Sequence, residues 1–171
     1  MGMGEPLVKL VELTDAFRRL TNAKWGMGIP AKRITISTAG LVSRFQAISK
    51  FGVNLAISLN ASTNEQRNRL MPAINRLHSL SELIATCREY PLPHGQRITF
   101  EYVMLDGVND SPSDAVDLAR LLKGIHAKVN LIPFNNWPGA KYRSSPPLVV
   151  KKFSQILNDN ELSAPIRAVS Y

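Results

Sequence analysis

The feature that most constrains the fold of this chain is an alternation of short apolar segments with longer segments of helical period. Strand-like segments occupy residues 33–37, 54–58, 97–104, 128–133 and 165–169. Apolar side chains recur at three- and four-residue steps, as in amphipathic helices, at residues 8–22, 42–50, 64–70, 80–90, 112–123 and 147–158. This alternation is typical of an α/β fold in which helical crossovers join the strands of a parallel sheet.

The length of the chain limits how far such a sheet can close. Right-handed crossovers permit either an open sheet or a barrel, and a closed eight-unit barrel typically takes about 250 residues. With 171 residues, the chain is too short for that barrel. We therefore predict a single domain over residues 1–171, a partial parallel (β/α) barrel truncated at both ends. Gly4-Glu5-Pro6 resembles the turn after a strand of which only Met1–Met3 would remain.

The charge of the chain favours polyanionic partners. Lys and Arg number 21 against 13 Asp and Glu, which gives a net charge of +8. Nucleic acid is the first candidate partner and an acidic membrane surface the second, although a basic domain without such a partner fits the charge equally well. No apolar run reaches the roughly 18 residues of a membrane-spanning helix. The N-terminus has no signal-peptide pattern, and one cysteine fits a reducing compartment, so we expect a cytoplasmic protein without a membrane partner.

The cysteine and histidine content argues against a metal site in this chain. Cys87 is the single cysteine, so neither an internal disulfide nor an iron–sulfur cluster with cysteine ligands can form. It continues the helical spacing of Leu80, Leu83 and Ile84, which predicts packing in the core. The three histidines are not at metal-ligand spacing, and we expect exposed or hydrogen-bonded side chains.

Polar residues recur where the predicted strands end. These strand exits are Gly4-Glu5, Ser37-Thr38, Ser58-Leu59-Asn60, Asp106–Asp110 and Asn135-Asn136. Ligands of parallel α/β folds bind at the carboxyl edge of the sheet, so the exits suit a polar small molecule. The alternative is that Ser37 and Asn60 are only helix caps or turn residues.

Two further features each allow two interpretations. Glu101 lies within a predicted strand, where its carboxylate would face either a bound ligand in the barrel interior or a salt-bridge partner. The segment 130–143 ends a strand and enters a basic, aromatic loop. Its Trp and Tyr rings could stack on nucleic-acid bases while its Lys and Arg contact phosphates. The alternative is a Pro-Gly turn with Trp137 packed onto the domain.

Five blocks at these exits, in this order, resemble the radical S-adenosylmethionine (SAM) methyltransferases that modify carbon 2 or carbon 8 of an adenine in large-subunit ribosomal RNA. The blocks are Gly2–Pro6, Arg33–Thr38, Leu55–Ala61, Glu101–Asp110 and Lys128–Asn135. The resemblance implies a SAM-dependent enzyme with a radical-SAM barrel that methylates carbon 2 of an rRNA adenine, with tRNA as a second candidate substrate. It also implies SAM and a [4Fe-4S] cluster as cofactors of the full-length family.

The same resemblance implies roles for individual residues. Gly4 and Glu5 would hold the amino group of SAM, and Ser37 would meet the same polar end. The zwitterionic methionine end needs carboxylate, carbonyl and hydroxyl partners of this kind.

At the other end of the cofactor, Ser58, Leu59 and Asn60 would line the ribose and adenine, and Asn135 would bond the adenosyl group. Many members of the family have His where this sequence has Asn60.

Two elements of the family pattern do not occur in this chain. Members bind the cluster through a Cys-x3-Cys-x2-Cys loop after the first barrel strand, and carry the methyl group on a cysteine near the C-terminus. The chain would therefore supply most of the SAM pocket and be inactive alone, with uncovered strand edges that favour self-association. A non-catalytic basic module that binds RNA or assembles with another chain remains an alternative, and a barrel enzyme for another anionic small molecule is a weaker one.

Overall fold

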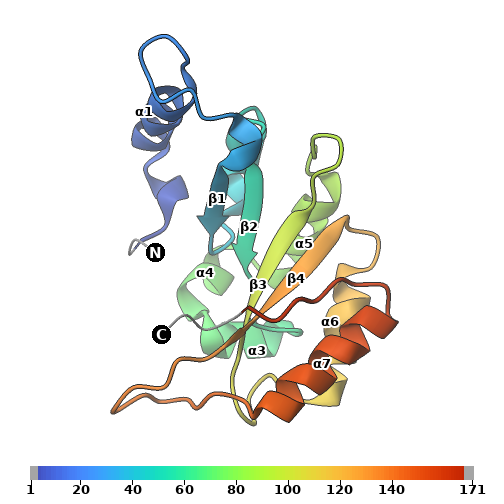
Figure 1. Cartoon of the computed structure of the whole chain (residues 1–171). Helices are drawn as coiled ribbons and strands as arrows, with labels where there is room; N and C mark the ends of the chain where they lie inside the picture. Colours follow the sequence, from blue (N-terminus) through green and yellow to red (C-terminus); the bar gives the residue numbers. More distant parts are fainter. Residues whose placement is uncertain (1–3, 168–171) are drawn as a thin grey trace.

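The computed structural model describes residues 4–167 and contains one parallel sheet (Figure 1). Its four strands lie in the order β1-β2-β3-β4. The strands are β1 (Thr35–Thr38), β2 (Asn54–Ser58), β3 (Ile98–Met104) and β4 (Ala127–Pro133). All three pairings are parallel, so the predicted α/β fold with an open, incomplete barrel is confirmed. The predicted preceding strand, Met1–Met3, lies outside the described residues.

Helices connect the strands on the pattern predicted from the apolar spacing. They are α1 (Leu10–Thr21), α2 (Phe45–Ser49), α3 (Asn64–Leu70), α4 (Pro72–Leu77), α5 (Leu80–Glu89), α6 (Pro112–Leu122) and α7 (Pro147–Asp159), with 3-10 turns η1 (Pro6–Val8), η2 (Ala31–Arg33) and η3 (Val42–Arg44). Hydroxyl groups of Thr63, Ser79 and Ser111 accept backbone N–H bonds at the starts of α3, α5 and α6. Within residues 4–167, no helix has both the length and the apolar character to cross a membrane.

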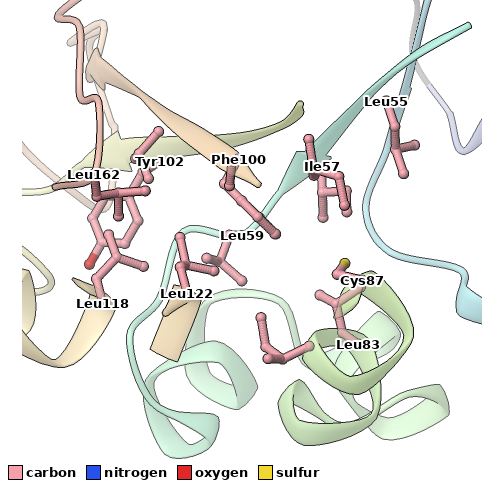
Figure 2. Packing of buried hydrophobic residues seen from close by; sticks show 14 of the residues in the cluster. Leu55, Ile57, Leu59, Leu83, Cys87, Phe100, Tyr102, Leu118, Leu122 and Leu162 are labelled. Carbon is pink, nitrogen blue, oxygen red and sulfur yellow. The ribbon is translucent and has the colours of Figure 1, made fainter. Parts of the chain in front are cut away.

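The hydrophobic core fills the space between one face of the sheet and the helices α5, α6 and α7 (Figure 1). Figure 2 shows Ile57 and Phe100 pointing from the strands toward Leu83 and Cys87 of helix α5. Because side chains alternate along a strand, the intervening residues point to the opposite face of the sheet. That opposite face is where the polar residues of the strands lie.

The last predicted strand, residues 165–169, is not a regular strand over its described part. Instead, the segment 163–167 runs beside β4 and makes three backbone bonds: Val129 N–H to Ser163 O (2.9 Å), Leu131 N–H to Pro165 O (3.0 Å) and Arg167 N–H to Leu131 O (2.8 Å). Only Leu131 and Ile166 form a parallel bridge. Pro165 has no N–H to donate, which limits the ladder. Residues 168 and 169 lie outside the described part of the chain.

Candidate functional site

Polar side chains form two rows across the open face of the sheet. Paired residues of neighbouring parallel strands direct their side chains to the same face. One row holds Ser37, Ala56, Thr99 and Lys128, and the next row, nearer the carboxyl edge, holds Ser58, Glu101 and Asn130. The strand register therefore brings hydroxyl, amide and carboxylate groups from all four strands onto one surface.

Ser37 and Ser58 are both half-buried on this face. Among residues 4–167, neither hydroxyl forms a hydrogen bond, whereas the neighbouring Thr38 donates to a carboxylate at 2.8 Å. The interpretation of Ser37 as a helix cap is not supported, because Leu41 precedes η3 and no side chain caps that turn. Both serine hydroxyls thus keep their donor and acceptor capacity for another molecule.

The Glu5 carboxylate joins the segment before α1 to the exit of β1. One oxygen, Oε1, accepts bonds from the Leu7 N–H (3.1 Å) and the Thr38 hydroxyl (2.8 Å), and the other, Oε2, accepts from the Ala39 N–H (2.7 Å). The preceding Gly4 has φ +128, a backbone conformation that favours glycine. The carboxylate is therefore held at the carboxyl edge of the sheet, beside the exit that carries Ser37.

Asn60 fastens the exit of β2 to β3. Its backbone adopts φ +58, and its side-chain Oδ1 accepts the Val103 N–H at 2.9 Å. Its carbonyl accepts a bond from Asn109 Nδ2 at 3.0 Å. The preceding Leu59 is fully buried and points into the core (Figure 2). Leu59 can therefore face a ligand only through its backbone, and the Oδ1 atom of Asn60 is already engaged.

Asn109 lies within the predicted exit 106–110, but the sequence patterns assigned it no structural role at this edge. It is fully buried. Its Oδ1 accepts the Leu105 N–H at 2.8 Å, and its Nδ2 also donates to the Val103 carbonyl at 2.8 Å. The Tyr102 hydroxyl donates to its carbonyl at 2.7 Å. An Asn in a strand-to-helix loop is a general signal for such backbone bonding, but only the fold identifies the partners.

Arg67 is a second residue that the sequence did not reveal. It lies on α3 and is fully buried. Its guanidinium donates to Asn75 Oδ1 (3.1 Å), to the His78 carbonyl (3.4 Å) and to the Ala39 carbonyl (2.7 Å). Burial lowers the pKa of this guanidinium, and the nearby Cys87 opposes that shift.

The Arg67 contact reaches the same loop that Glu5 holds. The N–H of Ala39 bonds the Glu5 carboxylate and its carbonyl bonds Arg67. A Cβ atom on the adjacent Gly40 would lie 3.1 Å from Arg67 Nη2 and 3.3 Å from Leu83, and Gly40 has φ +106. A side chain at position 40 would thus strain the backbone and crowd Arg67, so the loop depends on glycine.

Asn135 follows β4 at the same carboxyl edge but borders a separate hollow. It is exposed and lines a cavity of about 790 Å³ together with Phe134, Ser145 and the start of α7. Glu5, Ser37 and Ser58 do not line this cavity. The structure therefore places Ser37 and Ser58 on one face of the sheet. It holds Glu5 at the same carboxyl edge through Thr38, whose buried side chain is on the core-facing side of β1, whereas Asn135 lies beyond β4.

Glu101 sits in the middle of the open face and is 8% exposed. Its carboxylate lies 3.9 Å from a guanidinium nitrogen of Arg167, whose side chain is mostly exposed. Of the two interpretations of Glu101, the salt bridge is therefore present. Because the carboxylate also lies in the row of Ser58 and Asn130, it adds negative charge to the polar face.

The described residues do not fit an iron–sulfur cluster or another metal centre. In residues 4–167 there is no group of three or more His, Cys, Asp or Glu side chains that could hold a metal ion. Cys87 is 2% exposed and packs in the core, as predicted (Figure 2). Burial raises the pKa of its thiol to about 12, which Arg67 only partly offsets. A thiol of that kind remains protonated and cannot serve as a thiolate ligand near neutral pH.

Comparison with proteins of known family identifies close relatives over nearly the whole chain. The chain is 49% identical over 169 residues to a dual-specificity RNA methyltransferase RlmN from Methylocella silvestris, covering 98% of this chain and 42% of that protein. A protein of the same name from Syntrophobacter fumaroxidans is 47% identical, with 98% and 48% covered. The chain thus spans less than half the length of these curated relatives. No family model matches it.

Two solved structures share the fold. A radical SAM methyltransferase from Sphaerobacter thermophilus superposes with a TM-score of 0.91 at 43% identity, covering 98% of this chain and 49% of that one. A domain of a pyruvate-formate lyase-activating enzyme from Bacteroides vulgatus gives a TM-score of 0.73 at 18% identity, covering 98% and 97%. The second similarity concerns the fold alone.

Proposed function

Because the chain belongs to the radical SAM methyltransferase family of the RlmN type, we propose that it forms most of the SAM-binding part of an enzyme that methylates RNA. The observation that carries the proposal is the match to a radical SAM methyltransferase at 43% identity over 98% of the chain. We propose carbon 2 of an adenine in large-subunit rRNA as the methylated atom, with tRNA as a second substrate.

The methionine end of SAM would lie against Gly4-Glu5 and the exit of β1. Glu5 has a carboxylate held by Thr38 and Ala39, and each oxygen retains acceptor capacity for an ammonium group. The Ser37 hydroxyl has no partner among the described residues. It would donate a hydrogen bond to the carboxylate of SAM or accept one from its amino group. Gly4 would contribute its backbone carbonyl.

The adenosine end would lie further along the same edge. The free hydroxyl of Ser58, the backbone of Leu59 and the Nδ2 of Asn60 would face the ribose and adenine. Asn60 Nδ2 lies 3.5 Å from the Met71 sulfur, a weak contact that leaves donor capacity. Asn135, which is exposed beyond β4, would need to turn toward the same molecule.

The polar face also fits the charge of the cofactor. SAM carries a sulfonium cation; the face presents the Glu101 carboxylate, and the Glu5 carboxylate lies at the exit of β1. When bound beside an iron–sulfur cluster, SAM supplies the methyl group and the oxidising radical of this family. The described residues of this chain would bind and orient that molecule, while cluster ligands and the methyl-carrying cysteine would have to come from elsewhere. We therefore propose that this chain alone does not methylate RNA.

Binding of SAM to the chain tests the proposal directly. We expect saturable SAM binding in a calorimetric titration, about fivefold weaker binding for Ser58→Ala, and at least about tenfold weaker binding for Ser37→Ala. Ser58→Ala removes one neutral hydrogen bond, worth about 1 kcal/mol, whereas Ser37→Ala removes one to a charged group, worth about 1.5–3 kcal/mol. A methyl-transfer assay with rRNA fragments on the same preparation should give no product.

The matched control is Thr35→Val, which removes a hydroxyl on the same strand and the same face as Ser37 but two residues farther from the carboxyl edge. That variant should bind SAM as the unaltered chain does. Failure of the unaltered chain to bind SAM, or equal losses in Thr35→Val and Ser37→Ala, would contradict the assignment of the site.

A further inference from the structure

We propose that the loop 134–143 is a contact surface for unpaired RNA, on which the Trp137 ring stacks against a base. The proposal rests on the proposed function for its choice of RNA as the partner, and otherwise on the loop's own geometry. The Pro-Gly turn of one sequence interpretation is present, but Trp137 is 58% exposed, so most of this residue faces solvent rather than the domain.

The loop presents its aromatic side chain from a firmly held backbone. Ala140 N–H donates to the Trp137 carbonyl at 3.0 Å across Pro138-Gly139, and Gly139 has φ +83. Proline second and a positive-φ glycine third are the features of a type II turn. The Phe134 ring lies 5.0 Å from the Trp137 ring and supports the indole from one side.

The base of the loop is fastened to the sheet. The Asp106 N–H donates to the Arg143 carbonyl at 2.9 Å, and Leu105 pairs with Ser144 in an antiparallel bridge. The Ser144 N–H also donates to Asn136 Oδ1 at 2.9 Å. Since the two ends of the loop are tied together, its stacking surface is ordered before a partner arrives, which reduces the entropy cost of binding.

The charge around the loop complements a phosphate backbone. Residues 134–152 contain four basic side chains and no Asp or Glu; the basic residues are Lys141, Arg143, Lys151 and Lys152. Lys141, Arg143 and Lys151 are exposed, and the Lys141 ammonium lies 5.3 Å from the centre of the Tyr142 ring. Exposed aromatic rings among basic residues are the means by which proteins hold single-stranded nucleic acid.

The position of the loop fits an unpaired region of RNA better than a duplex or a protein. The loop projects from the carboxyl end of β4 (Figure 1), the sheet edge that carries Ser58 and Glu5. An RNA substrate would have to approach that edge to reach a bound SAM. Stacking on an indole requires an unstacked base, which loops and bulges of RNA provide and a continuous duplex does not.

The test uses the full chain and two fluorescent RNA probes: a single-stranded oligoadenylate of about ten nucleotides, within the footprint of single-strand binding modules, and a duplex of the same length. Anisotropy titrations should give tighter binding of the single strand. Trp137→Leu should weaken it about tenfold, and Trp137→Phe, which keeps a ring, should recover most of the affinity. Lys141→Ala should reduce the salt dependence of log K by about 0.7.

Trp25→Leu is the matched control. The chain has two tryptophans, and Trp25 is 65% exposed in the turn after α1, away from this loop (Figure 1). In Trp25→Leu, the remaining indole fluorescence should be quenched by the single strand and the affinity should be unchanged. In Trp137→Leu the quenching should disappear.

Equal affinity of Trp137→Leu and the unaltered chain, equal binding of duplex and single strand, or no binding of either RNA would overturn the loop proposal. SAM titrations on the same preparations distinguish a failure of the loop proposal from a failure of the proposed function. SAM binding without a role for Trp137 overturns only the loop proposal, whereas a chain that binds the single strand through Trp137 but never binds SAM overturns only the assignment of the cofactor site.

Discussion

Arg67 carries a guanidinium into the interior of the protein without an ion-pair partner among residues 4–167. Its contacts are two carbonyls and one amide oxygen, from two segments of the chain: α4 with the residue that follows it, and the loop after β1. Because one of these carbonyls belongs to Ala39, whose N–H holds Glu5, Arg67 connects α3 and α4 to the edge proposed to bind SAM. It is a positioning residue for that edge rather than a ligand.

Replacement of Arg67 by Met should lower the free energy of unfolding by about 2–3 kcal/mol, because buried acceptors lose their donors. The same variant, measured while folded, should also bind SAM more weakly, because the Ala39 loop is no longer held. Arg67→Lys keeps a charge but not the forked donor geometry, and should restore less than half of either loss. Urea denaturation and SAM titration measure the two effects.

The control for this prediction is Arg69→Met, an exposed position on the same helix. It should change the unfolding free energy by less than about 0.5 kcal/mol. If Arg67→Met proved as stable as Arg69→Met and bound SAM as the unaltered chain does, the positioning role would be wrong.

At the residue scale, sequence reasoning placed the candidate residues but not their bonds. Ser37 and Ser58 could be predicted at the sheet edge because each ends an apolar strand. The partner of Asn60, the Val103 N–H, and the partner of Glu5, the Ala39 N–H, lie 43 and 34 residues away in sequence. Such pairs are fixed by strand register and loop path, which no local pattern encodes.

At the scale of elements, α5 shows how a helix is fixed to the sheet. The Ser79 hydroxyl caps its start, and Leu83, Ile84 and Cys87 are buried along one side. Tyr90 follows its last turn, with its ring 5.9 Å from that of Phe45 in an edge arrangement. Burial raises the pKa of Tyr90 to about 12, and the Cys87 charge adds to that shift.

The raised pKa values of Cys87 and Tyr90 predict a loss of stability in alkali. The Cys87 thiol has an ordinary pKa of 9.0 and a pKa of about 12 in the folded chain. Above pH 9 the unfolded chain therefore loses a proton that the folded chain retains. Each group therefore contributes to the free energy of unfolding at neutral pH. That contribution falls as the pH rises toward 12, by up to about 1.4 kcal/mol per pH unit.

Urea midpoints measured between neutral pH and pH 11 check this dependence. Cys87→Ala should show a shallower decline than the unaltered chain above pH 9, although it starts less stable because a buried side chain is removed. Thr86→Ala, a half-buried position on the same helix without a titrating group, should keep the original slope. Parallel declines in all three proteins would show that the thiol is not responsible.

The elements themselves were largely predictable, and the exceptions have physical causes. The apolar spacing located β2 and α3 at their observed bounds, and it located β3 and β4 to within one residue. Helix α4 was not predicted, because a proline within a segment suggests a break in a helix. Pro72 instead occupies the first turn of α4, where its missing N–H is not needed. The segment 163–167 lies in strand-like register with β4, but proline interrupts its ladder.

At the scale of the whole molecule, the two outer edges of the sheet differ. The segment 163–167 covers the outer edge of β4. Among residues 4–167, no strand pairs with the outer edge of β1. The Asn54 N–H bonds the Ile34 carbonyl, so Thr35 and Ser37 direct their backbone groups away from β2. An unpaired edge of this kind can template pairing with another chain.

The open edge of β1 predicts self-association of the chain. The average mass in sedimentation velocity should rise with protein concentration over the micromolar to millimolar range. Thr35→Pro removes an outward N–H, and Thr35→Lys adds a charge at the edge, so both should reduce the association. A monomer at every concentration would contradict the prediction, as would association that neither variant changes.

Glu5 and Arg167 lie near the two ends of the described chain. Glu5 is bonded at the exit of β1, and Arg167 runs beside β4 and pairs with Glu101. A tag fused close to either residue would therefore compete for space with the proposed SAM site. The turns at residues 22–30 and 91–97 lead into the amino ends of the strands and offer safer insertion points for a fluorescent label or a surface anchor.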